Sequence, residues 1–282
     1  MYGTRSPIQA DSAFQVSNED GSGGSPRPKR LVIPCGWRIR HVCPMEPDQI
    51  LQEYGLHDVR IDMKRRAPSA FESPHAACFC RKDSWIVEIV GEPEDYLAFH
   101  ELMHIVLEVT NRRIETDYPD VQIKAYLFEL KNLFDDYLIE TEVQRRFGET
   151  YCPTYRALRC AESSTLRLVS SNIQPIVLLL DFLSIRNICT NVYPGLQGAP
   201  AAQVCASVIK SARLDAVVAA CRDYTFGLTP AMYVEGISNI HAALTDSRLS
   251  VDTRGNVRLS KRYTKQFLSD VSGIPEMLRR AM

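Results

Sequence analysis

Residues 97–108 read LAFHELMHIVLE, and the rest of the chain can be interpreted outward from this stretch. Its two histidines stand four positions apart, and the apolar residues around them recur at helical spacing. Residues i and i+4 lie on nearly the same face of an α-helix, so His100 and His104 can direct both imidazoles at one point. The preceding EPED, residues 92–95, suits a helix start, because proline fits the first turn and acids complement the helix dipole. We therefore predict a helix over 92–109 that carries both histidines.

His100, Glu101 and His104 form the pattern HExxH. On a helix, this pattern lets two imidazoles bind one metal ion while the carboxylate beside them contacts a metal-bound water. Zinc lowers the pKa of that water, and the carboxylate can take its proton as the water attacks a polarised carbonyl. The alternative is a helix whose two histidines face a polar core by coincidence. The uncharged residues inside the motif and the apolar residues beside it favour the metal site.

Upstream of this helix, short runs rich in β-branched and aromatic residues predict strands. They lie at Leu31–Ile33, Trp37–Val42, Val59–Met63, Ala77–Cys80 and Trp85–Val90, with one helix at Pro47–Tyr54 between them. The last run comes directly before the HExxH helix. We expect it to be an edge strand, which could hold an extended peptide beside the metal helix.

Downstream, helical patterns dominate, beginning with a long helix over Pro119–Phe147 that ends near Gly148. Further helices are predicted over about Thr154–Ser170, Ile173–Cys189, Ala201–Arg222, Thr229–Thr245 and Arg262–Arg280, with a small hairpin at Ser250–Leu259. The predicted fold class is α+β. A small twisted sheet packs on the HExxH helix, and a mostly helical C-terminal region follows.

The composition is that of a soluble globular protein: 282 residues, 45% hydrophobic and 24% charged, with a net charge of -1. Residues 1–30 are rich in Ser, Gly and Pro, and we expect a disordered tail there, followed by a metal-binding domain at 31–150 and a helical domain at 151–282. The balanced charge disfavours nucleic acid as a partner, and no apolar run approaches the roughly 20 residues of a membrane span. Without a visible secretory signal, and with an odd number of cysteines, a cytoplasmic location is expected.

The motif within LAFHELMHIVLE resembles the metal helix of zincin-type metallopeptidases, and the resemblance extends over about Ser84 to Phe147. It implies a hydrolase that uses Zn²⁺ to cleave a protein or peptide substrate, with His100 and His104 as ligands and Glu101 as general base. The longer metzincin motif needs a glycine and a third histidine soon afterwards, and the residues that follow, IVLEVTNRRIE, contain neither. The gluzincin branch, which takes its third ligand from an acid on a later helix, remains open.

The third ligand is sought on the long downstream helix, because two histidines and a water leave zinc one protein ligand short. The gluzincin pattern has two acids spaced by four, and Asp136 and Glu140 match that spacing, although the first acid is usually Glu. We predict Asp136 as the ligand, with Asp135 and then Glu140 as alternatives. The next acid could orient a ligand histidine. The competing interpretation is a solvated acidic face paired with Arg145 or Arg146.

Three weaker features stay open. Five residues could form a second, structural zinc site, although their spacing differs from that of zinc knuckles: Cys35, His41, Cys43, Cys78 and Cys80. A donor for a developing oxyanion could come from Tyr118, Tyr126, Tyr137, Tyr155 or His241, which the sequence does not rank. The segment 251–282 carries seven basic and three acidic residues, which is more typical of a solvated surface than of a nucleic-acid site.

These observations favour a zinc metallopeptidase that cleaves an intracellular protein. The alternative is a regulatory or protein-binding module on a zincin scaffold, with a structural or inactive metal site and a partner bound by the helical C-terminal region. The two differ in their coordination, because a catalytic zinc keeps one position open and a structural zinc is closed by four protein ligands. A metal-free helical interaction protein is the third possibility.

Overall fold

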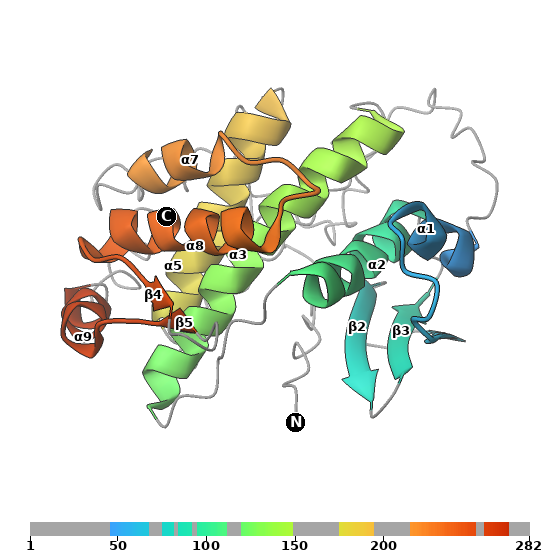
Figure 1. The fold of residues 1–282 in the computed structure, drawn as a ribbon, viewed down its shortest axis with the longest axis horizontal. Coiled ribbons are helices and arrows are strands. Elements are labelled where there is room, and N and C mark those ends of the chain that lie inside the picture. Colours follow the sequence, from blue (N-terminus) through green and yellow to red (C-terminus); the bar gives the residue numbers. More distant parts are fainter. Residues whose placement is uncertain are drawn as a thin grey trace, which may run out of the picture.

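The computed structural model describes residues 46–67, 75–81, 84–91, 95–111, 120–148, 175–194, 215–251 and 257–270. Within them the fold is α+β, with a small mixed sheet on one side and mostly helices on the other (Figure 1). The predicted tail, the first two predicted strands and the helix expected at 154–170 lie outside the described residues. No helix in the described ranges has the length and apolar character needed to cross a membrane.

The three-stranded sheet is built from β1 (Ile61–Arg66), β2 (His75–Arg81) and β3 (Ser84–Val90), in the order β1-β3-β2. Strand β1 is parallel to β3 and β2 is antiparallel to it. The prediction that Trp85–Val90 forms an edge strand is therefore wrong, because β3 is the middle strand of the three. Its nearly continuous apolar sequence agrees with that position, since Val87, Ile89 and their neighbours are buried.

Helix α2 (Asp95–Thr110) contains the HExxH residues and contacts β2 and β3, and it lies beside the sheet in Figure 1. Phe99, Leu102 and Met103 are almost fully buried, so apolar packing anchors the helix on both sides of His100. The short helix α1 (Pro47–Glu53) also packs on α2. The sheet and α1 therefore act as the support on which the histidine-bearing helix rests.

Helix α3 (Val121–Phe147) is the central element, and it separates α2 from the C-terminal helices in Figure 1. It begins at Asp120, whose carboxylate accepts hydrogen bonds from the first-turn backbone N–H groups, and it ends at Gly148 with a positive φ of 73°. Its neighbours are α2 on one side and, on the others, α5 (Pro175–Asn187), η1 (Ile188–Val192), α8 (Pro230–Thr245) and α9 (Lys261–Asp270).

The remaining elements complete the C-terminal region. Helix α7 (Asp215–Cys221) packs on α5 and α8, and β4 (Ser250–Val251) pairs antiparallel with β5 (Val257–Arg258), as the predicted hairpin requires. One hydrophobic cluster extends from Ile50 in α1 to Phe267 in α9. The division into domains at residue 150 stays a prediction, and α3 contributes to the packing on both sides of it.

Candidate metal centre

Helices α2 and α3 bring three ligand-type atoms to one point: Nε2 of His100, Nε2 of His104 and Oδ1 of Asp136. The two histidine nitrogens are 3.2 Å apart. The carboxylate oxygen lies 3.3 Å from the nitrogen of His104 and 3.6 Å from that of His100. The fold therefore brings the two predicted histidines together with the predicted third ligand, which lies more than thirty residues after them in the sequence.

The spacing of these atoms fits a tetrahedral zinc ion. Ligand atoms about 2.0–2.1 Å from a tetrahedral centre are separated from one another by about 3.3–3.4 Å. The three separations of 3.2, 3.3 and 3.6 Å lie around this value. Two imidazoles and one carboxylate are also a donor set that zinc accepts. The residues present therefore fit the group that the sequence motif implies.

Glu140 lies behind His100 rather than among the three ligand-type atoms. Its Oε1 is 2.9 Å from Nδ1 of His100, and its side chain is fully buried. Because a carboxylate accepts hydrogen bonds, this contact holds the proton on Nδ1 and leaves the lone pair of Nε2 directed at the metal position. Asp136 and Glu140 stand four residues apart on one face of α3, so one can meet the metal position while the other orients a ligand.

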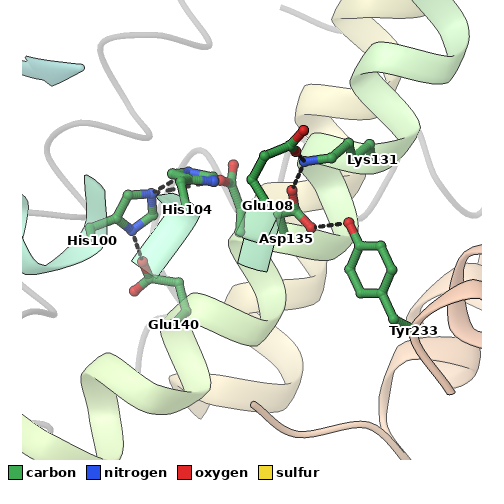
Figure 2. A network of polar contacts seen from close by, with 8 residues as sticks. His100, His104, Glu108, Lys131, Asp135, Glu140 and Tyr233 are labelled. Carbon is green, nitrogen blue, oxygen red and sulfur yellow. Dashed lines mark hydrogen bonds and ion pairs between the residues drawn. The ribbon is translucent and has the colours of Figure 1, made fainter. Parts of the chain in front are cut away.

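Asp135 is not brought to the histidines. One residue step turns the direction around a helix by about 100°, so Asp135 faces away from Asp136 and toward α8. Its carboxylate accepts hydrogen bonds from Tyr233 and Lys131, each at 2.5 Å. Figure 2 shows His100, His104 and Glu140 on one side and the Asp135 cluster on the other. Asp135 is thus engaged elsewhere, and the alternative of Asp135 as third ligand is not realised in this structure.

The Asp135 cluster contains its own cation. Lys131 pairs with Asp135 and, at 3.2 Å, with Glu108. Burial opposes the charge of the ammonium group, but the two carboxylates outweigh it and raise the pKa of Lys131 well above its ordinary value. Burial has the opposite effect on Tyr233, whose pKa it raises, and this keeps the hydroxyl protonated as a donor. This cluster is a partly buried ion network that joins α2, α3 and α8.

The arginines of α3 do not account for the acids of the metal position. Arg145 pairs with Glu142, and Arg146 pairs with Glu53 of α1. Tyr54, which directly follows α1, also donates to Glu142. These contacts tie the C-terminal end of α3 to α1. The competing interpretation, in which Asp136 and Glu140 belong to a face paired with arginine, therefore gains no support from these pairs.

The site is buried on one side and partly accessible on the other. Glu101, the predicted general base, is 3% exposed and lies next to His100 on α2. The side chains of His104 and Asp136 are 13% and 21% exposed. The solvent-accessible side of the site is therefore formed by His104 and Asp136, while His100 and Glu140 are shielded. A general base must come within hydrogen-bond reach of the proton that it takes, and Glu101 follows the ligand-type residue His100 directly on the same helix.

Other predicted residues lie elsewhere. The hydroxyl of Tyr126 is 2.7 Å from Nδ1 of His241, and both residues are fully buried between α3 and α8. Tyr137 is also buried. Cys78 and Cys80 lie on β2 and are half-buried. The structure does not describe the remaining candidates for the oxyanion donor and the second zinc site: Cys35, His41, Cys43, Tyr118 and Tyr155.

Sequence reasoning missed Tyr193, whose hydroxyl donates to Oε2 of Glu140 at 3.2 Å. No motif surrounds this tyrosine, and it lies 53 residues from its partner, so no local signal announces the contact. Comparison with protein-family models, curated proteins and solved structures gives no match to the chain. The case for a metal centre therefore depends on the geometry of its own residues.

Proposed function

We propose that this protein is a zinc-dependent hydrolase that cleaves a peptide bond of a protein or peptide substrate. One observation carries the proposal. The two histidines of HExxH lie near Asp136 at separations suited to a tetrahedral ion, and the glutamate that follows His100 in the same motif is buried. We also propose that the α+β fold contains a zincin-like core, in which α2 is the active-site helix.

The number of ligands supports a catalytic rather than a structural metal. Among the described residues, the group of ligand-type side chains consists of His100, His104 and Asp136. Three protein ligands are typical of catalytic zinc, and a structural zinc is closed by four. Zinc held in this way supplies a Lewis acid that polarises a carbonyl group and acidifies water.

The chain's own residues have separate tasks in the proposed reaction. Glu101 takes a proton from the attacking water as the water oxygen forms a C–O bond to the carbonyl carbon. It then passes that proton to the nitrogen of the leaving amine as the peptide C–N bond breaks. Glu140 keeps the ring of His100 in the ligating orientation. The partly exposed side of His104 and Asp136 admits the substrate.

The test is digestion of a diverse peptide mixture by the zinc-loaded protein, analysed by mass spectrometry. We expect products that sum to the parent peptide plus one water, and a loss of about 10²–10⁴-fold in rate for Glu101→Gln, the usual contribution of a general base. Glu101→Gln should keep its zinc. A zinc-loaded wild-type protein that leaves the mixture intact, or a Glu101→Gln variant that cleaves at the wild-type rate, would contradict the proposal.

A further inference from the structure

We propose that Tyr193 is a positioning residue for the metal centre, acting on the ligand His100 through Glu140. This inference rests on the proposed function and deepens it, because it makes the C-terminal region part of the zinc site. The two contacts are consecutive. The hydroxyl of Tyr193 donates to Oε2 of Glu140, and Oε1 of Glu140 lies 2.9 Å from Nδ1 of His100. All three side chains are at least nine-tenths buried, so water competes little for these contacts.

A change of helix type places this tyrosine. Helix α5 continues into the π-helical turn η1, and the backbone N–H of Tyr193 donates to the carbonyl of Ile188 at 2.9 Å. Such a turn holds one residue more than an α-helical turn, which rotates the following chain by about 100°. The direction of Tyr193 toward α3 therefore depends on η1.

The π-helical turn is itself fixed to the C-terminal region. The side-chain amide of Asn191 donates to Oδ1 of Asn187 at 2.7 Å and to the backbone carbonyl of Val218 in α7 at 3.0 Å. Asn187 is fully buried. The position of Tyr193 is thus set by α5 and α7 together. Tyr193 in turn contacts Glu140 through one hydrogen bond.

Tyr233 provides a matched control within the same molecule. Tyr193 and Tyr233 are each 1% exposed, and each donates its hydroxyl to a carboxylate on α3. The carboxylate bound by Tyr193 contacts His100, and the one bound by Tyr233 contacts Lys131. Removing either hydroxyl therefore imposes a similar structural change, but only the removal at Tyr193 acts on a ligand of the metal.

The experiment measures zinc affinity by competition with a chelating dye, and the visible spectrum of the Co²⁺-loaded protein, for wild type, Tyr193→Phe and Tyr233→Phe. We expect Tyr193→Phe to weaken zinc binding about tenfold, the lower end of the range for residues that orient ligands, and to shift the Co²⁺ bands. Tyr233→Phe should keep the wild-type affinity within about twofold and the wild-type spectrum. Thermal melts of the metal-free proteins show how far each substitution disturbs the fold itself.

A second pair of variants isolates the route through Glu140. Glu140→Gln should weaken zinc binding about 10–100-fold, and adding Tyr193→Phe to it should produce no further loss. Equal zinc affinity and spectra in Tyr193→Phe and wild type would overturn the positioning role, as would an undiminished effect of Tyr193→Phe in the Glu140→Gln background. A wild-type protein that binds neither zinc nor Co²⁺ would instead overturn the proposed function together with this inference.

Discussion

Helix α3 presents two acidic clusters on two of its sides, and they differ in what balances their charge. Toward α8, Asp135 contacts Lys131 and Tyr233, and Lys131 also reaches Glu108. Toward α2, Asp136 and Glu140 contact the imidazoles of His100 and His104. One cluster contains a lysine as its cation. The other joins carboxylates to imidazoles, and these are the donor groups that bind a divalent cation.

The comparison teaches that adjacent carboxylates on one helix can serve different purposes. Asp135 belongs to contacts that link three helices, and its buried carboxylate would be left uncompensated if the positive charge of Lys131 were removed. Asp136 lies beside two imidazole nitrogens, at atom spacings typical of a metal site. Substitutions on the α8 side should therefore change the free energy of unfolding, and substitutions on the α2 side should change metal binding.

The largest effect is expected from the histidines of α2. We expect wild type to bind about one zinc ion per chain. The double variant His100→Ala/His104→Ala should bind none, because it removes two of the three proposed ligands. His57→Ala is the control, since His57 is exposed on the loop before β1. Elemental analysis of the purified proteins measures the difference, and zinc retained in the double variant would refute the assignment.

On the opposite side of α3, Lys131→Met should lower the free energy of unfolding by about 3 kcal/mol, because it leaves the buried carboxylate of Asp135 and the partly buried carboxylate of Glu108 without their cation. This loss is at the low end of the range for breaking a buried ion pair, because the lysine side chain is 17% exposed. Urea unfolding measures the change, with exposed Lys124→Met on the same helix as the control. Zinc affinity should stay at the wild-type value, and a large loss would remove the contrast between the two clusters.

The contact between α3 and α8 can be tested at Gly236. A Cβ added there would lie 2.3 Å from Cζ of Phe134, so the two helices approach closely at this glycine. Gly236→Ala should therefore destabilise the fold by about 2 kcal/mol through overpacking. Adding Phe134→Leu should recover part of this loss in urea unfolding. A purely additive double variant would show that the ring is not the cause.

The smallest effect concerns pH. His241 on α8 is buried among the hydroxyl groups of Tyr126, Thr245 and Ser247, and burial lowers its pKa to about 4. The unfolded chain, with a pKa near 6.5, then binds more protons than the folded one as the pH falls below 6.5, so stability falls with pH in that window. Between pH 7 and 5.5 the loss should be about 1 kcal/mol.

Urea unfolding of the wild type and of His241→Gln across this pH range isolates that contribution. The variant has no imidazole at this position, so the difference in free energy between the two proteins should narrow as the pH falls. A constant difference would mean that His241 is protonated in the folded protein as readily as in the unfolded chain.

Much of the α2 side could be predicted from the sequence, because its signals are local. Helical spacing predicts α2 and places His100 and His104 on one face, and the four-residue spacing of Asp136 and Glu140 predicts that both lie on one face of α3. The choice between Asp135 and Asp136 depends on the rotation of α3 against α2. Packing between distant segments sets that rotation, and the sequence expresses it only weakly.

Two features lay beyond sequence reasoning. The order β1-β3-β2 results from pairing between strands that are not consecutive, so the run Trp85–Val90 does not reveal whether it forms an edge or the centre. Tyr193 reaches Glu140 because α5 ends in a π-helical turn, and no residue pattern at Ile188–Val192 distinguishes such a turn from an α-helix. Both features arise from tertiary packing.

The most direct test of the central claim is the zinc affinity of two neighbouring variants, Asp135→Asn and Asp136→Asn, measured side by side with wild type. Asp136→Asn should weaken zinc binding by more than about a hundredfold, beyond the range for residues that only orient a ligand. Asp135→Asn should bind zinc within about twofold of wild type, because its carboxylate contacts Lys131 and Tyr233. Equal losses in both variants, or a loss confined to Asp135→Asn, would contradict the assignment of Asp136 to the metal centre.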